Sequence, residues 1–102
     1  MNKYNIEYSR DAKQDLIETK KYIKYTLQEP KTAQNLIKKI RREIEELKSS
    51  PEIYAIIDEE LIKNLEIRKL IINSYIVFYR IKNNNIQIVR IMYEGRNWIN
   101  LL

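Results

Sequence analysis

The sequence predicts an α+β fold: an N-terminal strand, an antiparallel two-helix hairpin packed on an antiparallel sheet of the C-terminal strands, and a short C-terminal tail. Three observations predict it. Residues 4–8 alternate apolar and polar side chains, the pattern of a half-buried strand. Residues 10–48 carry apolar side chains at intervals of three and four, as amphipathic helices do. Residues 67–93 hold three apolar runs separated by asparagine-containing turns.

The first strand and the first helix are predicted from their boundary residues. The strand covers Tyr4 to Tyr8, and Ser9 then has the side chain of an N-cap. Asp11 places negative charge in the first helical turn, where the helix dipole favours it. We therefore expect a helix from Arg10 to about Gln28, with an apolar stripe of Ala12, Leu16, Ile23 and Leu27.

The second helix is the more regular of the two. Pro30 ends the first helix and is compatible with the start of the next one. From Lys31 to Lys48 the apolar residues form one stripe: Ala33, Leu36, Ile37, Ile40, Ile44 and Leu47. Ser49-Ser50-Pro51 ends the helix. The short link between the two helices predicts that they run antiparallel.

Residues 52–62 read as a loop with an apolar anchor, Ile53 to Ile57, and one helical turn around Asp58 to Lys63. Three strands follow, covering residues 67–72, 75–82 and 86–93. Asn73-Ser74 and Asn83-Asn84-Asn85 are the turns between them, since asparagine tolerates the left-handed conformation. Consecutive hairpins make these strands antiparallel.

The end of the chain is predicted to pack back onto the body. Gly95, the only glycine, follows the last strand and suggests a backbone position with positive φ. Residues 96–102 are too apolar to be frayed, and Trp98 is most simply a core anchor for this tail. With the helical hairpin on one face, we expect the other face or the rim of the sheet to carry the basic residues. The 102 residues are expected to form one domain.

Composition excludes several kinds of chemistry. The chain has no cysteine and no histidine, so thiol nucleophiles, thiolate metal sites and the commonest general base are all missing. No glycine-rich phosphate loop, nucleophile elbow or metal-ligand spacing is present. We expect no metal and no cofactor. No apolar run approaches a membrane span, and the N-terminus lacks the apolar core of a signal peptide, so we expect a cytoplasmic protein.

The net charge is concentrated in the C-terminal part of the chain. Residues 61–102 hold seven basic and two acidic side chains, which accounts for the formal net charge of +5. Residues 1–60 hold twelve of each sign and sum to zero. A positive potential confined to one half of a small domain attracts a polyanion or an acidic partner.

The predicted target-binding residues are cations on the strands and the polar groups around the glycine: Arg68, Lys69, Arg80, Arg90, Tyr93 and Arg96. Arg90 interrupts an apolar strand, which indicates either a functional cation or a structural ion pair, with Glu66 or Glu94 as the partner. Tyr93 and Arg96 have the side chains of a patch that contacts phosphates and bases.

These residues carry a resemblance to a known family. The helix opening Ser9-Arg10-Asp11-Ala12-Lys13-Gln14-Asp15-Leu16, the helix and proline stop over residues 33–51, and the strand segments over residues 67–98 occur in the order and spacing of the RelE/ParE superfamily of bacterial toxins. The resemblance runs from Tyr4 to Leu102. It implies a growth-arresting toxin of a toxin–antitoxin module, of the plasmid stabilisation kind, that a cognate antitoxin protein holds inactive.

The superfamily contains two kinds of toxin. RelE-like members are mRNA interferases that enter the ribosome and stabilise the scissile phosphate with cations, a chemistry that needs no histidine. By position, Lys69 matches a strand lysine of that branch and Arg96 an arginine past its last strand, while Tyr93 is a third catalytic candidate. Ile76 stands where that branch has a strand arginine, and Leu102 where it has a late tyrosine.

ParE-like members instead inhibit DNA gyrase through a binding surface. The segments Val77-Phe78-Tyr79-Arg80 and Ile88-Val89-Arg90-Ile91 resemble that branch more closely, so gyrase is the favoured target. Two alternatives stay open. One is a ribosome-dependent endoribonuclease, and the other is a simple nucleic-acid-binding module that uses the same cations on phosphates.

Overall fold

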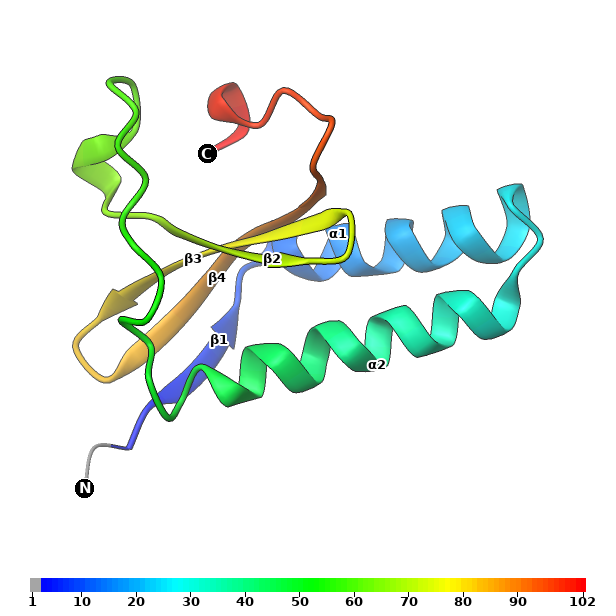
Figure 1. Ribbon diagram of the computed structural model, residues 1–102, viewed down its shortest axis with the longest axis horizontal. Coiled ribbons are helices and arrows are strands. Elements are labelled where there is room, and N and C mark those ends of the chain that lie inside the picture. Colours follow the sequence, from blue (N-terminus) through cyan, green and yellow to red (C-terminus); the bar gives the residue numbers. More distant parts are fainter. Residues whose placement is uncertain (1–2) are drawn as a thin grey trace.

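The structure is a computed structural model that describes residues 3–102, and its elements follow the predicted order (Figure 1). They are β1 (Asn5–Tyr8), α1 (Arg10–Lys21), the π-helical turn η1 (Tyr22–Thr26), α2 (Pro30–Glu46), β2 (Arg68–Ile72), β3 (Tyr75–Lys82) and β4 (Asn85–Tyr93), with short 3₁₀ turns at η2 (Lys63–Leu65) and η3 (Ile99–Leu101). Within residues 3–102, neither α1 nor α2 nor any shorter helix has the length and apolar character that crossing a bilayer requires.

The sheet has four strands in the order β1-β4-β3-β2. The three C-terminal strands are antiparallel neighbours, as the sequence predicts. β1 joins at the edge of β4 and runs parallel to it, so the complete sheet is mixed. The fold class is therefore α+β with an N-terminal strand, two helices and a four-stranded mixed sheet. β1 matters for the site because it brings the start of α1 beside β4.

The helix boundaries follow the capping signals in the sequence. The Ser9 hydroxyl accepts a hydrogen bond from the Ala12 amide at 2.9 Å, which confirms the predicted N-cap. The predicted first helix ends as the π-helical turn η1, and Gln28 has a φ of 54° before Pro30 opens α2. In Figure 1 the chain doubles back at this link, so α2 returns beneath the sheet toward β1.

The turns use left-handed residues where the sequence predicts them. Asn73 and Asn83 have φ values of 54° and 56°, a conformation that asparagine adopts more readily than most residues. The helical turn that we expected around Asp58 to Lys63 is present, because the Lys63 amide donates to the Glu59 carbonyl at 2.8 Å. It continues into η2, and Glu66 ends η2 in the left-handed region with a φ of 55°.

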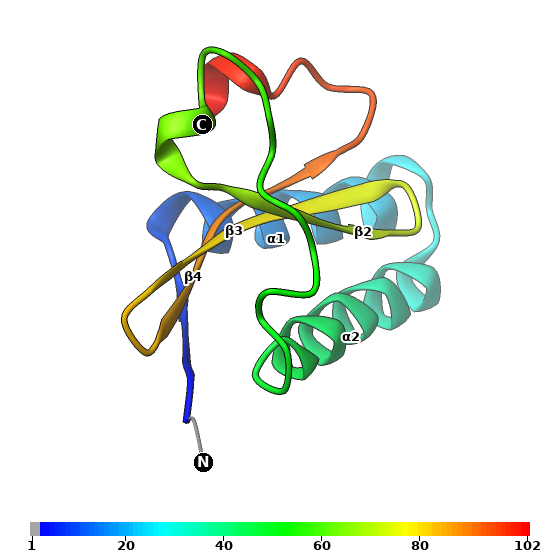
Figure 2. The same ribbon diagram turned by 60° about the vertical axis from the view of Figure 1, so that its left-hand side comes forward.

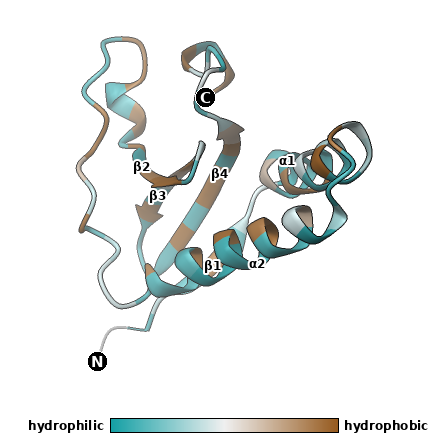
Figure 3. Ribbon diagram, turned by 45° about the vertical axis from the view of Figure 1, so that its right-hand side comes forward, coloured by the Kyte–Doolittle hydropathy of each residue, from teal (hydrophilic) through white to brown (hydrophobic). Residues whose placement is uncertain are grey.

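The sheet is covered on both faces, by different parts of the chain (Figure 3). One face packs on α1 and α2. The other packs under the segment before β2 and under the C-terminal tail, which come together above the sheet in Figure 2. The apolar residues on the face that packs on α1 and α2 form the helix-side cluster, which includes Ile40, Val77 and Ile91. Those on the other face form the tail-side cluster, which consists of Ile57, Ile62, Ile67, Ile76, Phe78 and Met92, with Trp98, Ile99 and Leu102 packed against it. The tail therefore packs back as predicted. The second face, which we expected to carry basic residues on an uncovered surface or at its rim, is instead covered at its centre, because loop and tail supply apolar side chains that bury it.

Gly95 departs from its predicted backbone conformation, because its φ is not positive. Its role is a close approach instead. A Cβ built on residue 95 would lie 2.9 Å from Cε1 of Tyr93, which is too close for an unstrained contact. A side chain at position 95 would therefore displace the exposed Tyr93 ring, so glycine is compatible with the observed position of that ring.

Tyr79 connects the sheet to the end of α2, and its hydroxyl provides a test of that connection. The side chain is wholly buried, and the hydroxyl donates a hydrogen bond to the Pro51 carbonyl at 2.8 Å. We expect Tyr79→Phe to lower the free energy of unfolding by about 1–3 kcal/mol, because a buried carbonyl loses its donor.

The same side chain predicts a loss of stability at alkaline pH. Burial raises the pKa of Tyr79 to about 12, from 10.0. A tyrosine whose pKa is higher in the folded state makes its full contribution to the free energy of unfolding below pH 10. That contribution is lost as the pH rises from 10 to 12. Urea titrations at pH 8, 10 and 11 should therefore show a smaller alkaline loss of stability in Tyr79→Phe than in the wild type. An equal loss in both would assign the alkaline transition to other groups.

Candidate functional site

Arg90 lies in a closed ion pair with Asp15 of α1. Its Nε and Nη2 donate hydrogen bonds to the two Asp15 carboxylate oxygens at 2.8 and 2.9 Å, and the two side chains are 15% and 5% exposed. The hydrogen bond to Asp15 is the main reason why the pKa of Arg90 is raised. Of the two predicted roles for Arg90, the structure shows the ion pair. Its partner is Asp15, and the prediction of Glu66 or Glu94 as the partner is wrong.

Asp15 also completes the edge of β4. β1 pairs with β4 only as far as Ile88, after which α1 takes its place beside the strand. The Ser9 hydroxyl donates to the Val89 carbonyl at 2.7 Å, and the Ile91 amide donates to the Asp15 carboxylate at 2.9 Å. Two side chains from the β1–α1 corner therefore replace the hydrogen bonds of a missing strand.

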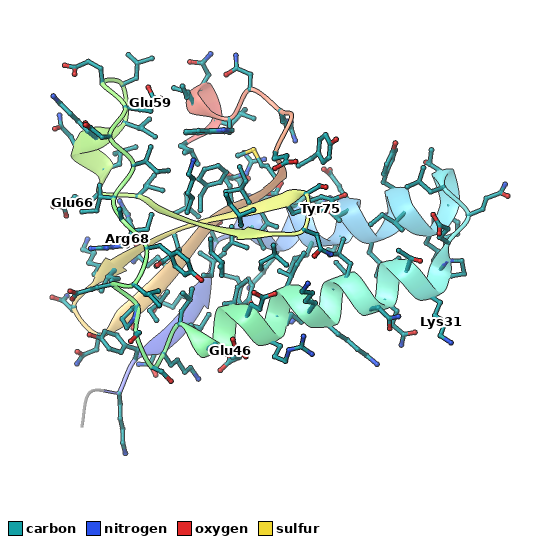
Figure 4. All side chains as sticks on the ribbon, viewed as in Figure 1. Lys31, Glu46, Glu59, Glu66, Arg68 and Tyr75 are labelled. Atoms are coloured by element: carbon teal, nitrogen blue, oxygen red, sulfur yellow. The ribbon has the colours of Figure 1, made fainter. Side chains whose placement is uncertain are left out.

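Arg68 and Arg80 have partners within the chain. The Arg68 guanidinium donates to the Tyr54 carbonyl at 2.5 Å and to the Glu52 carbonyl at 3.3 Å, so it fastens the loop that precedes β2. Figure 4 shows Arg68 beside that loop, with Glu66 close by. Arg80 Nε donates to Gln87 Oε1 at 2.7 Å, across the β3–β4 ladder. Both guanidinium groups are half-buried. Their acceptors are backbone carbonyls and a glutamine side chain, which carry no charge.

Tyr93 and Arg96 lie together at the end of β4. Tyr93 is 55% exposed, and its ring meets that of Tyr75 edge-on with the centroids 5.9 Å apart. The Arg96 amide donates to the Tyr93 carbonyl at 3.1 Å, and the Arg96 side chain is exposed. Figure 4 labels Tyr75 at the end of the sheet that faces the α1–α2 link. The structure thus brings together two of the three catalytic candidates.

Lys69, the third candidate, lies on the other face of the sheet. It pairs with Phe78, which belongs to the tail-side cluster, and its ammonium lies 6.0 Å from the centre of the Trp98 ring. Tyr93 pairs instead with Tyr75, which packs on the helix-side cluster. Residues opposed in an antiparallel pair point to the same face, so Lys69 and Tyr93 point in opposite directions.

A cavity of about 640 Å³ opens beside Tyr93 and Arg96, between the α1–α2 link and the β2–β3 turn. Its walls include residues that the sequence analysis did not single out, namely Tyr22, Tyr75, Glu18 and Glu29, and also Leu27, which we expected in the apolar stripe of the first helix. Tyr22, the first residue of η1, is 53% exposed. Eight tyrosines in a chain with one phenylalanine were the signal for an exposed aromatic surface, because the phenol ring is apolar with a polar tip.

The predicted basic residues do not form one continuous surface, because several of them are paired within the chain. Arg90 is neutralised, Arg68 is committed to loop carbonyls, and Lys63 is paired with Glu60 at 3.1 Å. Lys69 and Arg96 are exposed, but Lys69 lies on the tail side of β2, whereas Arg96 lies beyond β4 and lines the cavity beside α1. The arrangement provides an aromatic and arginine-containing surface at the end of β4, and not one continuous field of cations.

Comparisons with known proteins agree with this fold. A chain of the chromosomal ParDE toxin–antitoxin system of Pseudomonas aeruginosa superposes with a TM-score of 0.75 at 21% identity, covering 91% of this chain and 98% of that one. A chain of the RelBE2 toxin–antitoxin complex of Mycobacterium tuberculosis superposes with a TM-score of 0.62 at 16% identity, covering 94% and 97%. Among curated proteins, no sequence matches the chain.

The family itself is established by sequence. The model of the ParE toxin of the type II toxin–antitoxin system parDE matches residues 6–98, from β1 through the four-stranded sheet to Trp98. This range contains the Asp15–Arg90 pair, the aromatic surface and most of both clusters of the core. The chain therefore belongs to the ParE toxin family of type II toxin–antitoxin systems.

Proposed function

We propose that this toxin arrests growth in the cytoplasm by binding DNA gyrase, and that a cognate antitoxin protein holds it inactive. Membership of the ParE family supports a toxin with an antitoxin partner. The choice of binding over RNA cleavage rests on one observation: the three candidate catalytic side chains do not converge. Lys69 lies on the tail side of the sheet, whereas Tyr93 and Arg96 lie at the helix side of its end.

Lys69 and Tyr93 point to opposite faces of the sheet, and the distance between them along the sheet adds to their separation. β2 and β4 are two strand spacings apart, and Tyr93 is three residues beyond the position in register with Lys69. Their Cα atoms are therefore about 14 Å apart. A general acid or base must come within about 3 Å of the proton that it transfers. Ile76, at the position of the strand arginine in the ribonuclease branch, is 5% exposed in the tail-side cluster.

The surface at the end of β4 has the composition of a protein-binding site. Tyrosine and arginine dominate binding hot spots, because they combine a large rigid contact area with hydrogen bonding. Tyr93 and Arg96 adjoin the 640 Å³ cavity, and Tyr22 and Tyr75 extend its aromatic wall. A toxin that acts by binding requires such a surface and no nucleophile of its own.

Two substitutions test this surface. We expect Tyr93→Ala and Arg96→Ala each to weaken inhibition of gyrase supercoiling by about 10-fold or more, since removal of a hot-spot side chain costs upward of 1–2 kcal/mol. The measurement is the toxin concentration that halves supercoiling of relaxed plasmid by purified gyrase. Lys82→Ala is the matched control, because Lys82 is an exposed cation at the opposite end of β3. Equal inhibition by all three variants would contradict the assignment of this surface.

The target itself is tested by induced expression. Gyrase inhibition predicts filamentous cells and a DNA-damage response while translation continues. Ribosomal mRNA cleavage predicts that protein synthesis stops within minutes, and that primer extension finds cuts inside translated codons. Such cuts, made by the purified toxin on translating ribosomes, would replace the gyrase proposal with the endoribonuclease. Salt-dependent binding to bare DNA or RNA would instead favour the simple nucleic-acid-binding module.

A further inference from the structure

The cavity beside Tyr93 is walled by three tyrosines that come from three different elements. Tyr22 opens η1, Tyr75 opens β3 and Tyr93 ends β4. Tyr75 and Tyr93 are opposed in the β3–β4 ladder, and their ring planes meet at 68°. Burial is the main reason why the pKa of Tyr75 is raised, and the nearby phenol groups of Tyr22 and Tyr93 raise it further. The three rings therefore meet around one cavity, and we call them the tyrosine cage.

The π-helical turn η1 shapes the helix side of the cavity. The Leu27 amide donates to the Tyr22 carbonyl at 3.2 Å, a hydrogen bond that spans five residues where an α-helix would span four. A continuous α-helix would place Leu27 on the core stripe with Ile23. Instead Ile23 is buried, whereas Leu27 is 48% exposed and lines the cavity. Single π-helical turns are frequent at functional sites, and this one adds an apolar side chain to the wall beside Tyr22.

Carboxylates outnumber cations around the cavity, although the chain as a whole has a net charge of +5. The charged residues that line it are Asp15, Glu18, Glu29 and Arg96. The two oxygens of the Asp15 carboxylate accept hydrogen bonds from Arg90, so the charge of this side chain is neutralised. Two carboxylates, on Glu18 and Glu29, therefore remain against one guanidinium, on Arg96.

Glu18 and Glu29 are available to a ligand. Both are exposed, and within residues 3–102 neither forms an ion pair. Their contacts inside the chain are long hydrogen bonds to neutral groups: Glu18 accepts from the Gln14 amide at 3.3 Å, and Glu29 accepts from the Thr32 hydroxyl at 3.4 Å. A cation that enters the cavity can therefore pair with these carboxylates without breaking an ion pair of the toxin.

We propose that the tyrosine cage receives an arginine side chain of the gyrase target, with Glu18 and Glu29 as its counter-ions. The inference rests on the proposed function in one respect, namely that a protein target binds at the end of β4. A flat guanidinium can stack on a phenol ring and donate hydrogen bonds to a carboxylate at the same time. The cavity of about 640 Å³ is within the range of about 300–1,000 Å³ that is typical of ligand sites.

The walls of the cavity discriminate against other side chains. An aspartate or glutamate would meet two carboxylates and one cation, so on balance it would be repelled. An apolar side chain would cover the two carboxylates without giving them hydrogen bonds, which is unfavourable. A lysine ammonium would pair with the carboxylates, but it is compact and strongly hydrated and lacks the flat surface that stacks on a ring.

The first test is the direction in which a loss of charge changes gyrase inhibition. Glu18→Gln/Glu29→Gln removes both counter-ions and keeps the shape of two exposed side chains, so the variant should fold. We expect half-inhibition of supercoiling to require about 10-fold more variant than wild type, because the arginine of the target loses its partners. Stronger inhibition by the variant would indicate an acidic partner at this surface and would overturn the inference, as would unchanged inhibition.

Glu46→Gln/Glu59→Gln is the matched control, because it makes the same charge change at two other exposed carboxylates. Figure 4 labels both residues, and both lie away from Tyr75. The control should inhibit gyrase like the wild type. A control that lost as much inhibition as the cage variant would assign the effect to the overall charge of the toxin and would overturn the inference.

A free probe tests the tyrosine cage without gyrase. The probe is N-acetyl-arginine amide, and N-acetyl-citrulline amide has nearly the same shape without the charge. We expect the arginine probe to shift the ring-proton NMR signals of Tyr22, Tyr75 and Tyr93 saturably, and the citrulline probe to bind about 10-fold more weakly. No saturable shift, or equal affinity for the two probes, would overturn the inference. Tighter binding of tetramethylammonium would assign the cage to a quaternary ammonium ligand instead.

The two proposals fail separately. A wild-type chain that does not inhibit gyrase would refute the proposed function, and the probes would still test the cage. A wild-type chain that inhibits gyrase but does not bind the arginine probe would overturn the inference and leave the proposed function intact.

Discussion

Asp15→Ala is expected to lower the free energy of unfolding by about 3–5 kcal/mol, the largest effect that we predict for a polar side chain. The substitution leaves the Arg90 guanidinium, only 15% exposed, without its counter-ion. It also removes the acceptor of the Ile91 amide at the edge of β4. Breaking a buried pair from one side is costly because the remaining charge stays desolvated and unpaired.

Urea titration followed by far-ultraviolet circular dichroism measures this loss. Asp11→Ala is the control, because Asp11 is an exposed acidic residue in the first turn of the same helix, where its interaction with the dipole contributes about 1 kcal/mol or less. Asp15→Asn should fall between the two, since the amide keeps an oxygen acceptor but loses the charge. If Asp15→Ala were no more destabilising than Asp11→Ala, the pair would not hold α1 against β4.

The same pair explains why Arg90 is unsuitable as a probe of target binding. Arg90→Ala would leave the Asp15 carboxylate buried without its cation, so any loss of toxicity would mix misfolding with lost contacts. Tyr93 and Arg96 avoid this difficulty, because both side chains are exposed at the end of β4.

Local sequence patterns were sufficient to predict the helices, strands and turns of the fold. Ser9 was predicted as an N-cap from its own identity and that of its neighbours, and its hydroxyl does cap α1. Asn73 and Asn83 were predicted to occupy turns, and both have positive φ. Each of these features depends on a few consecutive residues, which is the range over which a sequence pattern carries information.

The site depends on contacts between distant parts of the chain, and there the sequence was less informative. Asp15 and Arg90 are 75 positions apart, so sequence spacing gave no reason to pair them. One signal did exist: Asp15 is a carboxylate three residues after Ala12, on the buried side of α1. A charge at a core position requires a partner, and Arg90 was the matching charge on an apolar strand.

The sequence shows how many basic side chains residues 61–102 contain, but not on which face of the sheet each of them lies. Strand alternation places neighbours such as Arg68 and Lys69 on opposite faces, but it does not show which face the tail covers. That depends on Trp98, Ile99 and Leu102 reaching the second face of the sheet, an arrangement that only the folded chain reveals. The Gly95 prediction was wrong for a different reason. A glycine after a strand can serve a positive φ or a close approach, here to the ring of Tyr93 two residues earlier, and the residue type does not distinguish the two.

Phe78→Ala is the second prediction with a large expected effect. Phe78 is wholly buried at the centre of the tail-side cluster, and its ring lies 5.0 Å from that of Trp98, centroid to centroid. Removing it should lower the free energy of unfolding by about 3–5 kcal/mol, through lost apolar burial and the cavity left behind. The tail that carries Trp98 should lose its main aromatic contact at the same time.

Fluorescence separates these two effects, because Trp98 is the only tryptophan in the chain. In the folded Phe78→Ala variant, below the urea transition, its emission should shift to longer wavelength and become more accessible to a soluble quencher. Ile40→Ala is the matched control, since Ile40 is wholly buried in the helix-side cluster. Ile40→Ala should lower the free energy of unfolding by a similar amount, about 2–5 kcal/mol, and leave the emission of Trp98 in the native state unchanged. Identical native emission from both variants would show that Phe78 does not hold the tail on the sheet.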